Sequence, residues 1–77
     1  MWEFHISIHS FDQVQNFVRL ACEQSFDVMV GNDHQNINGK DLMGMFSLDY
    51  SRPVCVRADC AEDVFAAFHA NVENAIA

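Results

Sequence analysis

The sequence predicts a small α+β domain, an open-faced sandwich in which two long helices and one short helix cover one face of a four-stranded antiparallel sheet. Short segments of alternating apolar and polar residues, typical of half-buried strands, are separated by segments with apolar residues at helical spacing. The chain has 77 residues, of which 51% are hydrophobic and 19% charged, as in a globular domain with one core. We therefore expect a single domain over residues 1–77, in the order β-α-β-β-α-β-α.

The first half of the chain predicts a strand, a helix and a hairpin. Residues 2–8 alternate strictly, with Trp2, Phe4, Ile6 and Ile8 on the apolar side. Ser10 and Gln13 fit a capping box at the start of a helix. The expected apolar face of that helix is Phe11, Val14, Phe17, Val18 and Ala21. Residues 26–30 alternate again, and a turn at residues 31–33 predicts that residues 34–38 return as a third strand.

The second half predicts a short helix, a strand and a long helix. A short, mostly apolar run follows the turn at residues 38–40, and we expect its Leu42 and Leu48 to belong to the core. Pro53 ends this region, and residues 54–58 alternate as the fourth strand. The last helix presents one apolar face of Val64, Phe65, Phe68, Val72 and Ile76. The polar face of the sheet is then expected to carry Glu3, His5, Ser7, Asp27, Met29, Cys55 and Arg57.

The charge of the chain argues against two classes of partner. The formal net charge is −7, with only four Lys and Arg residues, so phosphate backbones and anionic membrane surfaces are repelled. No apolar stretch approaches the ~20 residues of a membrane span, and the N-terminus lacks the basic start of a signal peptide. We expect a cytoplasmic protein that binds neither nucleic acid nor membranes, and that is a monomer.

Cysteine and histidine positions predict neither a disulfide framework nor a metal site. Three cysteines are an odd count, which suits a reducing compartment. His5 and His9 are four apart, which on a strand is roughly 13 Å, too far for one ion. Cys55 and Cys60 lack a second pair at zinc spacing. We expect no metal and no cofactor, and we expect His34 and His69 to be solvated.

The stretch Asn38 to Leu48, NGKDLMGMFSL, together with the order of elements, resembles the histidine-containing phosphocarrier protein (HPr) of the bacterial sugar phosphotransferase system. In that family the segment reads Leu-Met-Gly-x-Met-Ser-Leu or a close variant, and LMGMFSL at residues 42–48 is similar to it. The resemblance implies a short helix at about residues 42–48, which is a contact surface for the proteins that exchange phosphoryl groups. It puts Leu42, Met43 and Phe46 at contact positions, with Lys40 and Asp41 at the edge.

The motif that carries the chemistry of this family is absent. The family has Leu-His-x-Arg-Pro at the start of the first long helix, where this chain has Ser10 at the histidine position and Asp12 at the arginine position. A carboxylate there repels a phosphoryl group. We therefore expect no catalytic residue and no enzyme activity. A shift of one residue leaves His9 as a candidate phosphoryl acceptor, and otherwise His9 is a surface residue at a strand end.

Asp41 stands where Gram-positive members carry a regulatory serine that becomes phosphorylated. Two interpretations stay open and are compatible with one another. Asp41 is a good N-cap residue whose charge suits the helix dipole. It would also supply one negative charge where a phosphoserine supplies about −1.5 to −2, which is a partial imitation of the phosphorylated state.

These observations predict a degenerate or regulatory HPr-like protein that acts by binding phosphotransferase-system or regulatory proteins. The first alternative is a phosphocarrier that works through His9. The second is an interaction or oligomer-forming domain unrelated to sugar transport, which uses the polar sheet face around His5, Met29 and Cys55.

Overall fold

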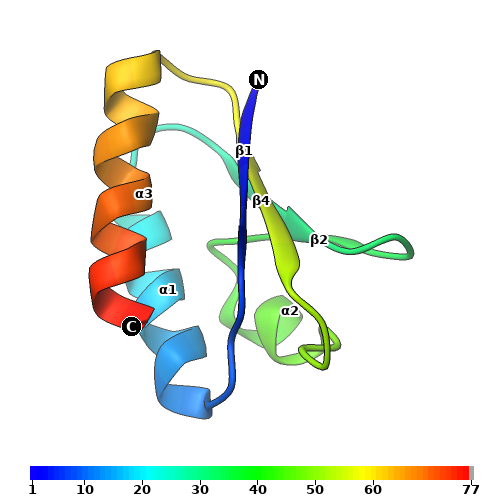
Figure 1. Ribbon diagram of the computed structural model, residues 1–77. Helices are drawn as coiled ribbons and strands as arrows, with labels where there is room; N and C mark the ends of the chain where they lie inside the picture. Colours follow the sequence, from blue (N-terminus) through cyan, green and yellow to red (C-terminus); the bar gives the residue numbers. More distant parts are fainter. Residues whose placement is uncertain (77) are drawn as a thin grey trace.

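The computed structural model describes residues 1–76 and has the predicted α+β architecture, with a four-stranded antiparallel sheet and three helices. The elements follow the predicted order (Figure 1). They are β1 (Trp2–Ile6), α1 (Phe11–Cys22), β2 (Val28–Gly31), β3 (Asn36–Asn38), α2 (Leu42–Phe46), β4 (Val54–Ala58) and α3 (Glu62–Ile76).

The sheet joins strands that are far apart in the sequence. Its strand order is β1-β4-β2-β3, and every neighbouring pair is antiparallel. Ile6 pairs with Val54 at one end of β1 and Trp2 pairs with Ala58 at the other. Val28 pairs with Ala58 from the opposite side of β4. Strand β4 is therefore central, with the first strand of the chain on one side and the β2–β3 hairpin on the other.

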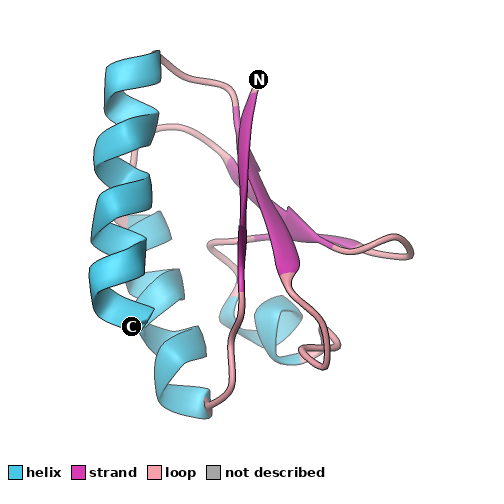
Figure 2. Cartoon of the chain, in the orientation of Figure 1, coloured by secondary structure: helices cyan, strands magenta, loops and turns pink. Residues whose placement is uncertain are grey.

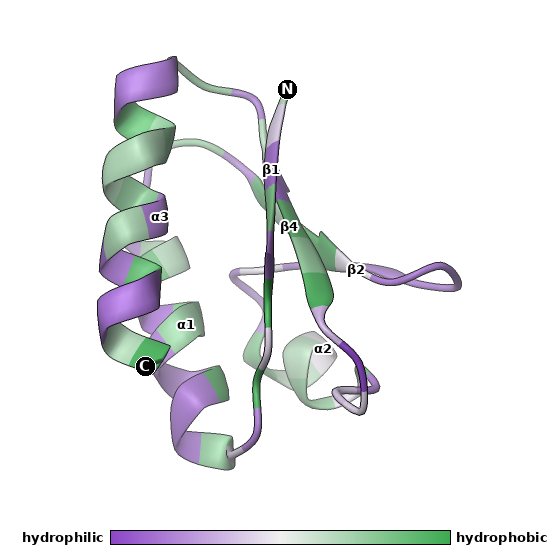
Figure 3. Cartoon of the chain, in the orientation of Figure 1, coloured by the Kyte–Doolittle hydropathy of each residue, from purple (hydrophilic) through white to green (hydrophobic). Residues whose placement is uncertain are grey.

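The helices leave one face of the sheet uncovered (Figure 2). Helices α1 and α3 pack against each other on one side of the sheet, and α2 contacts both α1 and β3, to the right of α1 in Figure 1. In Figure 3, α3 carries alternating hydrophilic and hydrophobic bands, whereas the β2–β3 loop is hydrophilic. This amphipathic pattern is what an open-faced sandwich requires.

Aromatic side chains dominate the core between the sheet and the long helices. Phe68 is 1% exposed, and its ring centroid lies 5.8–6.5 Å from those of Phe4, Phe17, Phe26 and Phe65. Such tilted and edge-on pairs each add to the stabilisation from buried area. The strands contribute mainly valine to the same cluster, from Val28, Val30, Val54 and Val56.

The ends of several elements differ from the prediction. Strand β1 ends at Ile6 because β4 begins with its partner Val54, although Ile8 is still buried. Strand β2 begins at Val28, so Phe26 lies before it and packs on Phe68. Strand β3 is shorter than residues 34–38 and α2 is shorter than residues 42–48.

Trp2 and Val64, both predicted on apolar faces, are partly solvent-exposed. Trp2 is 40% exposed and Val64 is 42% exposed. Both lie where the sheet and α3 begin, beyond most of the core. The indole Nε1 of Trp2 donates to the carbonyl oxygen of Cys60 at 2.9 Å, which ties the start of β1 to the approach to α3.

The sequence predicted that His69 is solvated, but in the structure its ring is partly covered by neighbouring side chains. It is half-buried, and its ring stacks on that of Phe4 with a centroid distance of 4.0 Å. Its Nε2 lies 2.8 Å from Oε1 of Glu73, one helical turn further along α3. His34 is exposed, as expected.

Candidate functional site

The start of α1 is held by a small set of hydrogen bonds. Ser10 has an extended backbone, and its Oγ accepts from the backbone N–H of Gln13 at 3.3 Å, as predicted for the N-cap. The reciprocal bond of the capping box falls one residue early, because Oε1 of Gln13 accepts from the backbone N–H of His9 at 2.6 Å. The Nε2 of Gln13 donates to the carbonyl oxygen of Ile76 at 2.7 Å. Gln13 therefore ties the His9–Ser10 turn to the end of α3.

An open pocket of about 390 Å³ lies between the start of α1 and α2. Its walls come from the β1–α1 connection, from α1, and from the region of α2: Ile8, His9, Ser10, Phe11, Val14, Phe46 and Tyr50. His9 is exposed at this pocket. No Lys or Arg belongs to the wall, so the described residues offer no side-chain cation that could neutralise a phosphoryl group there.

Tyr50 is a wall residue that the sequence analysis did not single out. Its hydroxyl donates to the carbonyl oxygen of Met45, near the end of α2. Burial raises the pKa of Tyr50 to about 12, so the phenol is neutral at physiological pH. Tyr50 therefore fixes the end of α2 against the pocket and supplies no charge.

Phe11 lies outside the core, contrary to the prediction. The side chain is 68% exposed, and its ring centroid lies 4.4 Å from that of Phe46 on α2. Phe11 is the first residue of α1, beyond the part of the helix that covers the sheet, so helical spacing alone could not show which neighbour it meets. The contact with Phe46 links the start of α1 to α2 across 35 residues of sequence.

Helix α2 exposes two of its four apolar side chains, and Phe46 is partly buried. Met43 is 77% exposed and Leu42 is 36% exposed, whereas Met45 is fully buried. The expectation that Leu42 belongs to the core is wrong, while Leu48 is buried as expected. Because Leu42 and Met43 lie four and three residues before Phe46, each of them neighbours Phe46 on the helix surface. We call Phe11, Leu42, Met43 and Phe46 the α1–α2 apolar surface.

Asp41 occupies the N-cap position of α2, but its side chain makes no capping hydrogen bond. Only its carbonyl oxygen joins the helix, by accepting from the backbone N–H of Met45 at 2.9 Å. The side-chain cap expected from the sequence is therefore absent, and the exposed carboxylate lies beside Gly44, where a Cβ would come within 3.0 Å of it.

Lys40 is half-buried, and its Nζ donates to the carbonyl oxygen of Gln24 at 2.8 Å. This bond ties the approach to α2 to the segment after α1. The lysine ammonium therefore has a partner within the chain, which the sequence did not predict.

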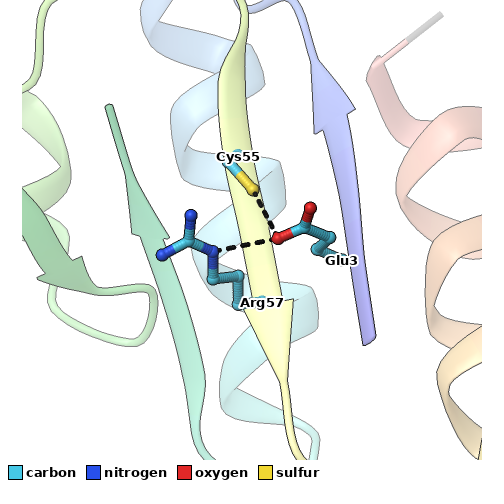
Figure 4. A network of polar contacts seen from close by, with 3 residues as sticks. All are labelled: Glu3, Cys55 and Arg57. Atoms are coloured by element: carbon cyan, nitrogen blue, oxygen red, sulfur yellow. Dashed lines mark hydrogen bonds and ion pairs between the residues drawn. The ribbon is translucent and has the colours of Figure 1, made fainter. Parts of the chain in front are cut away.

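The uncovered sheet face carries five of the seven residues predicted for it, since Ser7 and Asp27 lie outside β1 and β2. Glu3, His5, Met29 and Arg57 are exposed, and Cys55 is half-buried. Oε2 of Glu3 lies 3.1 Å from Nε of Arg57 and 3.6 Å from Sγ of Cys55 (Figure 4). Burial raises the pKa of the Cys55 thiol, and the nearby Glu3 charge adds to the shift. Cys55 is thus a poor nucleophile at neutral pH.

Metal-holding side-chain clusters and membrane-spanning helices are both absent from the described residues. Within residues 1–76, no group of three or more His, Cys, Asp or Glu residues is arranged to hold a metal ion. No helix in that part of the chain has the length and apolar character needed to cross a membrane.

Solved structures with a similar fold are phosphocarrier proteins and a related protein. HPr-C-His from Thermoanaerobacter tengcongensis is 27% identical, with a TM-score of 0.74 over 99% of this chain and 96% of that one. The histidine-containing phosphocarrier protein of Mycoplasma is 13% identical, with a TM-score of 0.72 over 97% of each chain. Crh, the catabolite repression protein of Bacillus subtilis, is 21% identical, with a TM-score of 0.66 over 92% of this chain and 86% of that one.

No protein-family model and no curated protein sequence matches this chain. The structural similarity extends over nearly the full length of the chain, so the HPr-like fold expected from the sequence is confirmed.

Proposed function

We propose that this chain is a protein-binding relative of HPr, acting within or derived from the sugar phosphotransferase system of a bacterium, and that it is not a phosphohistidine relay. Its place of action would be the cytoplasm. The observation that carries the proposal is the α1–α2 apolar surface, which lies beside a helix start that has no cation. An exposed apolar patch with polar surroundings commonly marks an interface.

The loss of relay chemistry is argued from the pocket at the start of α1. A histidine relay needs an imidazole nucleophile, helix amides that hold phosphate oxygens, and a cation that stabilises their charge. Ser10 occupies the N-cap and its hydroxyl accepts a hydrogen bond from Gln13. Asp12 adds a negative charge in the first turn, and the pocket wall contains no Lys or Arg. These residues favour repulsion of a phosphoryl group.

The α1–α2 apolar surface suits a protein partner. Met43 is unbranched and adapts its shape to a contact, and Phe11 and Phe46 supply rigid apolar area. The exposed Asp41 carboxylate has no capping bond, so it is available to a cation on the partner. This arrangement supports the idea that Asp41 imitates a phosphorylated serine. The ammonium group of Lys40 is already bonded to the carbonyl oxygen of Gln24, so Lys40 would contribute less of its charge to the contact with a partner.

The first test is the intact mass of the protein after incubation with phosphoenolpyruvate and the purified first enzyme of the phosphotransferase system. We expect no gain in mass while a normal HPr control gains one phosphoryl group. An acid-labile gain that disappears in His9→Ala would reject the binding-module proposal and establish a carrier. This second candidate function has one observation in its favour, which is that His9 is exposed at the pocket.

The second test measures binding of the same first enzyme by titration calorimetry. We expect Met43→Lys to weaken binding by roughly 30-fold, the effect of losing about 2 kcal/mol at an interface hot spot. Met29→Lys is the matched control, since Met29 is also exposed but lies on the uncovered sheet face. A loss that is confined to Met29→Lys, or that appears as dimer dissociation in light scattering, would instead favour the alternative of an interaction domain that uses the sheet face.

A reduced affinity in Asp41→Ala, with an unchanged circular dichroism spectrum, would support the imitation of a phosphoserine. Equal affinity of Asp41→Ala and the natural protein would show that Asp41 takes no part in the contact.

A further inference from the structure

A polar groove lies where the β2–β3 loop, residues 32–35, meets the segment between α2 and β4. It consists of two adjoining cavities of about 160 and 330 Å³, which share Asn32, Asp33, Arg52 and Pro53 as walls. The groove is separate from the pocket at the start of α1, with which it has no wall residue in common.

The smaller cavity is the more cationic end of the groove. Arg52, Arg57 and His5 line it beside the half-buried Cys55, and Asp33 is the one carboxylate among its wall residues. The chain has only four Lys and Arg residues and a net charge of −7, so half of its permanent cations converge on this one cavity. This concentration of positive charge is out of proportion to the composition.

Each of these two arginines keeps terminal nitrogens that lie free of the Glu3 carboxylate. Arg57 uses its Nε to bind Glu3, and its two terminal nitrogens point away from that carboxylate (Figure 4). Within residues 1–76, no hydrogen bond or ion pair engages the guanidinium group of Arg52. Guanidinium groups with free terminal nitrogens match the oxygens of a phosphate group in geometry and charge.

The larger cavity is the more acidic end. Asp33 and Asp49 line it together with Ser51 and His34, and the shared Arg52 is its one permanent cation. Asp49 accepts a hydrogen bond from the backbone N–H of Ser51 at 2.9 Å, and this bond holds the pKa of the carboxyl below its usual value. A bare inorganic anion that filled both cavities would meet these carboxylates. A ligand with hydroxyl groups would donate hydrogen bonds to them instead.

We propose that this groove binds a small phosphate monoester that carries hydroxyl groups. The phosphate lies between Arg52 and Arg57, and the hydroxyl groups lie toward Asp33 and Asp49. The two halves of one molecule then occupy the two cavities. The phosphate oxygens accept hydrogen bonds from the arginines, and the hydroxyl groups donate to the carboxylates. The proposal is independent of the α1–α2 apolar surface and stands whether or not the protein binds an enzyme there.

The test is a titration of the ¹⁵N-labelled protein with glycerol 3-phosphate at constant ionic strength, followed by backbone amide shifts. We expect saturable shifts at residues 31–35 and 49–57, and weaker binding of inorganic phosphate and of glycerol, each of which offers only one half of the ligand. Arg52→Gln is expected to lower the affinity for glycerol 3-phosphate about tenfold, as for the loss of a charge-assisted hydrogen bond. Arg19→Gln, an exposed arginine on α1, is the control of equal charge and is expected to bind like the natural protein.

Three outcomes would overturn the proposal. Equal affinities for inorganic phosphate and glycerol 3-phosphate would remove the role of the acidic end. Equal losses in Arg52→Gln and Arg19→Gln would reduce the effect to net charge. Shifts confined to residues 9–14, or no shifts at all, would exclude the groove as the binding site.

Discussion

Replacing Gln13 with alanine is expected to destabilise the start of α1, because this one side chain makes two hydrogen bonds that join separate parts of the fold. Its Oε1 accepts from the N–H of His9 at 2.6 Å, and its Nε2 donates to the carbonyl oxygen of Ile76 at 2.7 Å. The variant leaves the Ser10 cap in place. The experiment therefore measures how much the two side-chain hydrogen bonds of Gln13 contribute to the free energy of unfolding.

The magnitude follows from the exposure of the two partners. The bond to His9 is exposed, so water replaces it at a cost of about 0.5 kcal/mol. The bond to Ile76 is partly buried, and its loss is expected to cost about 1–1.5 kcal/mol. The sum of about 1.5–2 kcal/mol corresponds to a fall in Tm of roughly 6–16 °C for a domain of this size.

Urea unfolding followed by circular dichroism measures this change. Gln15→Ala is the matched control, because Gln15 is exposed on the same helix and the substitution has the same effect on helix propensity. We expect the control to change the free energy of unfolding by less than about 0.5 kcal/mol. Equal midpoints for the two variants would refute the reasoning, since Gln13 would then contribute no more than a solvated surface residue.

Three other predictions concern the core, pH and cysteine reactivity. Phe68→Ala should lower the free energy of unfolding by about 3–5 kcal/mol, whereas the exposed Phe11→Ala should change it little, as measured by urea unfolding. Because the pKa of Tyr50 is raised in the folded state, the unfolded chain loses its phenol proton first, and the free energy of unfolding falls from about pH 10 to 12. This fall, measured by urea unfolding, should be smaller in Tyr50→Phe. Equal dependence of the free energy of unfolding on pH in the two proteins would contradict the prediction. Cys55 should react with iodoacetamide several times more slowly than the exposed Cys22, as measured by peptide mass spectrometry.

The candidate site could be predicted only in part. The resemblance to HPr placed Met43 on a contact surface, and the exposure of its side chain agrees with that expectation. Leu42 was assigned to the core, but in a helix of five residues Met45 fills the buried position instead. The role of Tyr50 could not be predicted, because a single tyrosine in a loop has no periodic pattern. Whether these residues bind a partner stays a prediction.

The sequence by itself determined the order of elements and most of the core. Alternation in β1 and β4 and helical spacing in α1 and α3 are local patterns, and each says which side chains of one element face the same way. Only the tertiary structure decided which elements meet. The contact of Phe11 with Phe46, the bond from Gln13 to Ile76 and the convergence of Arg52 with Arg57 depend on how the helices, loops and strands pack together. The physical reason is that periodicity describes one segment at a time, whereas a site is made by side chains from segments brought together when the core is buried.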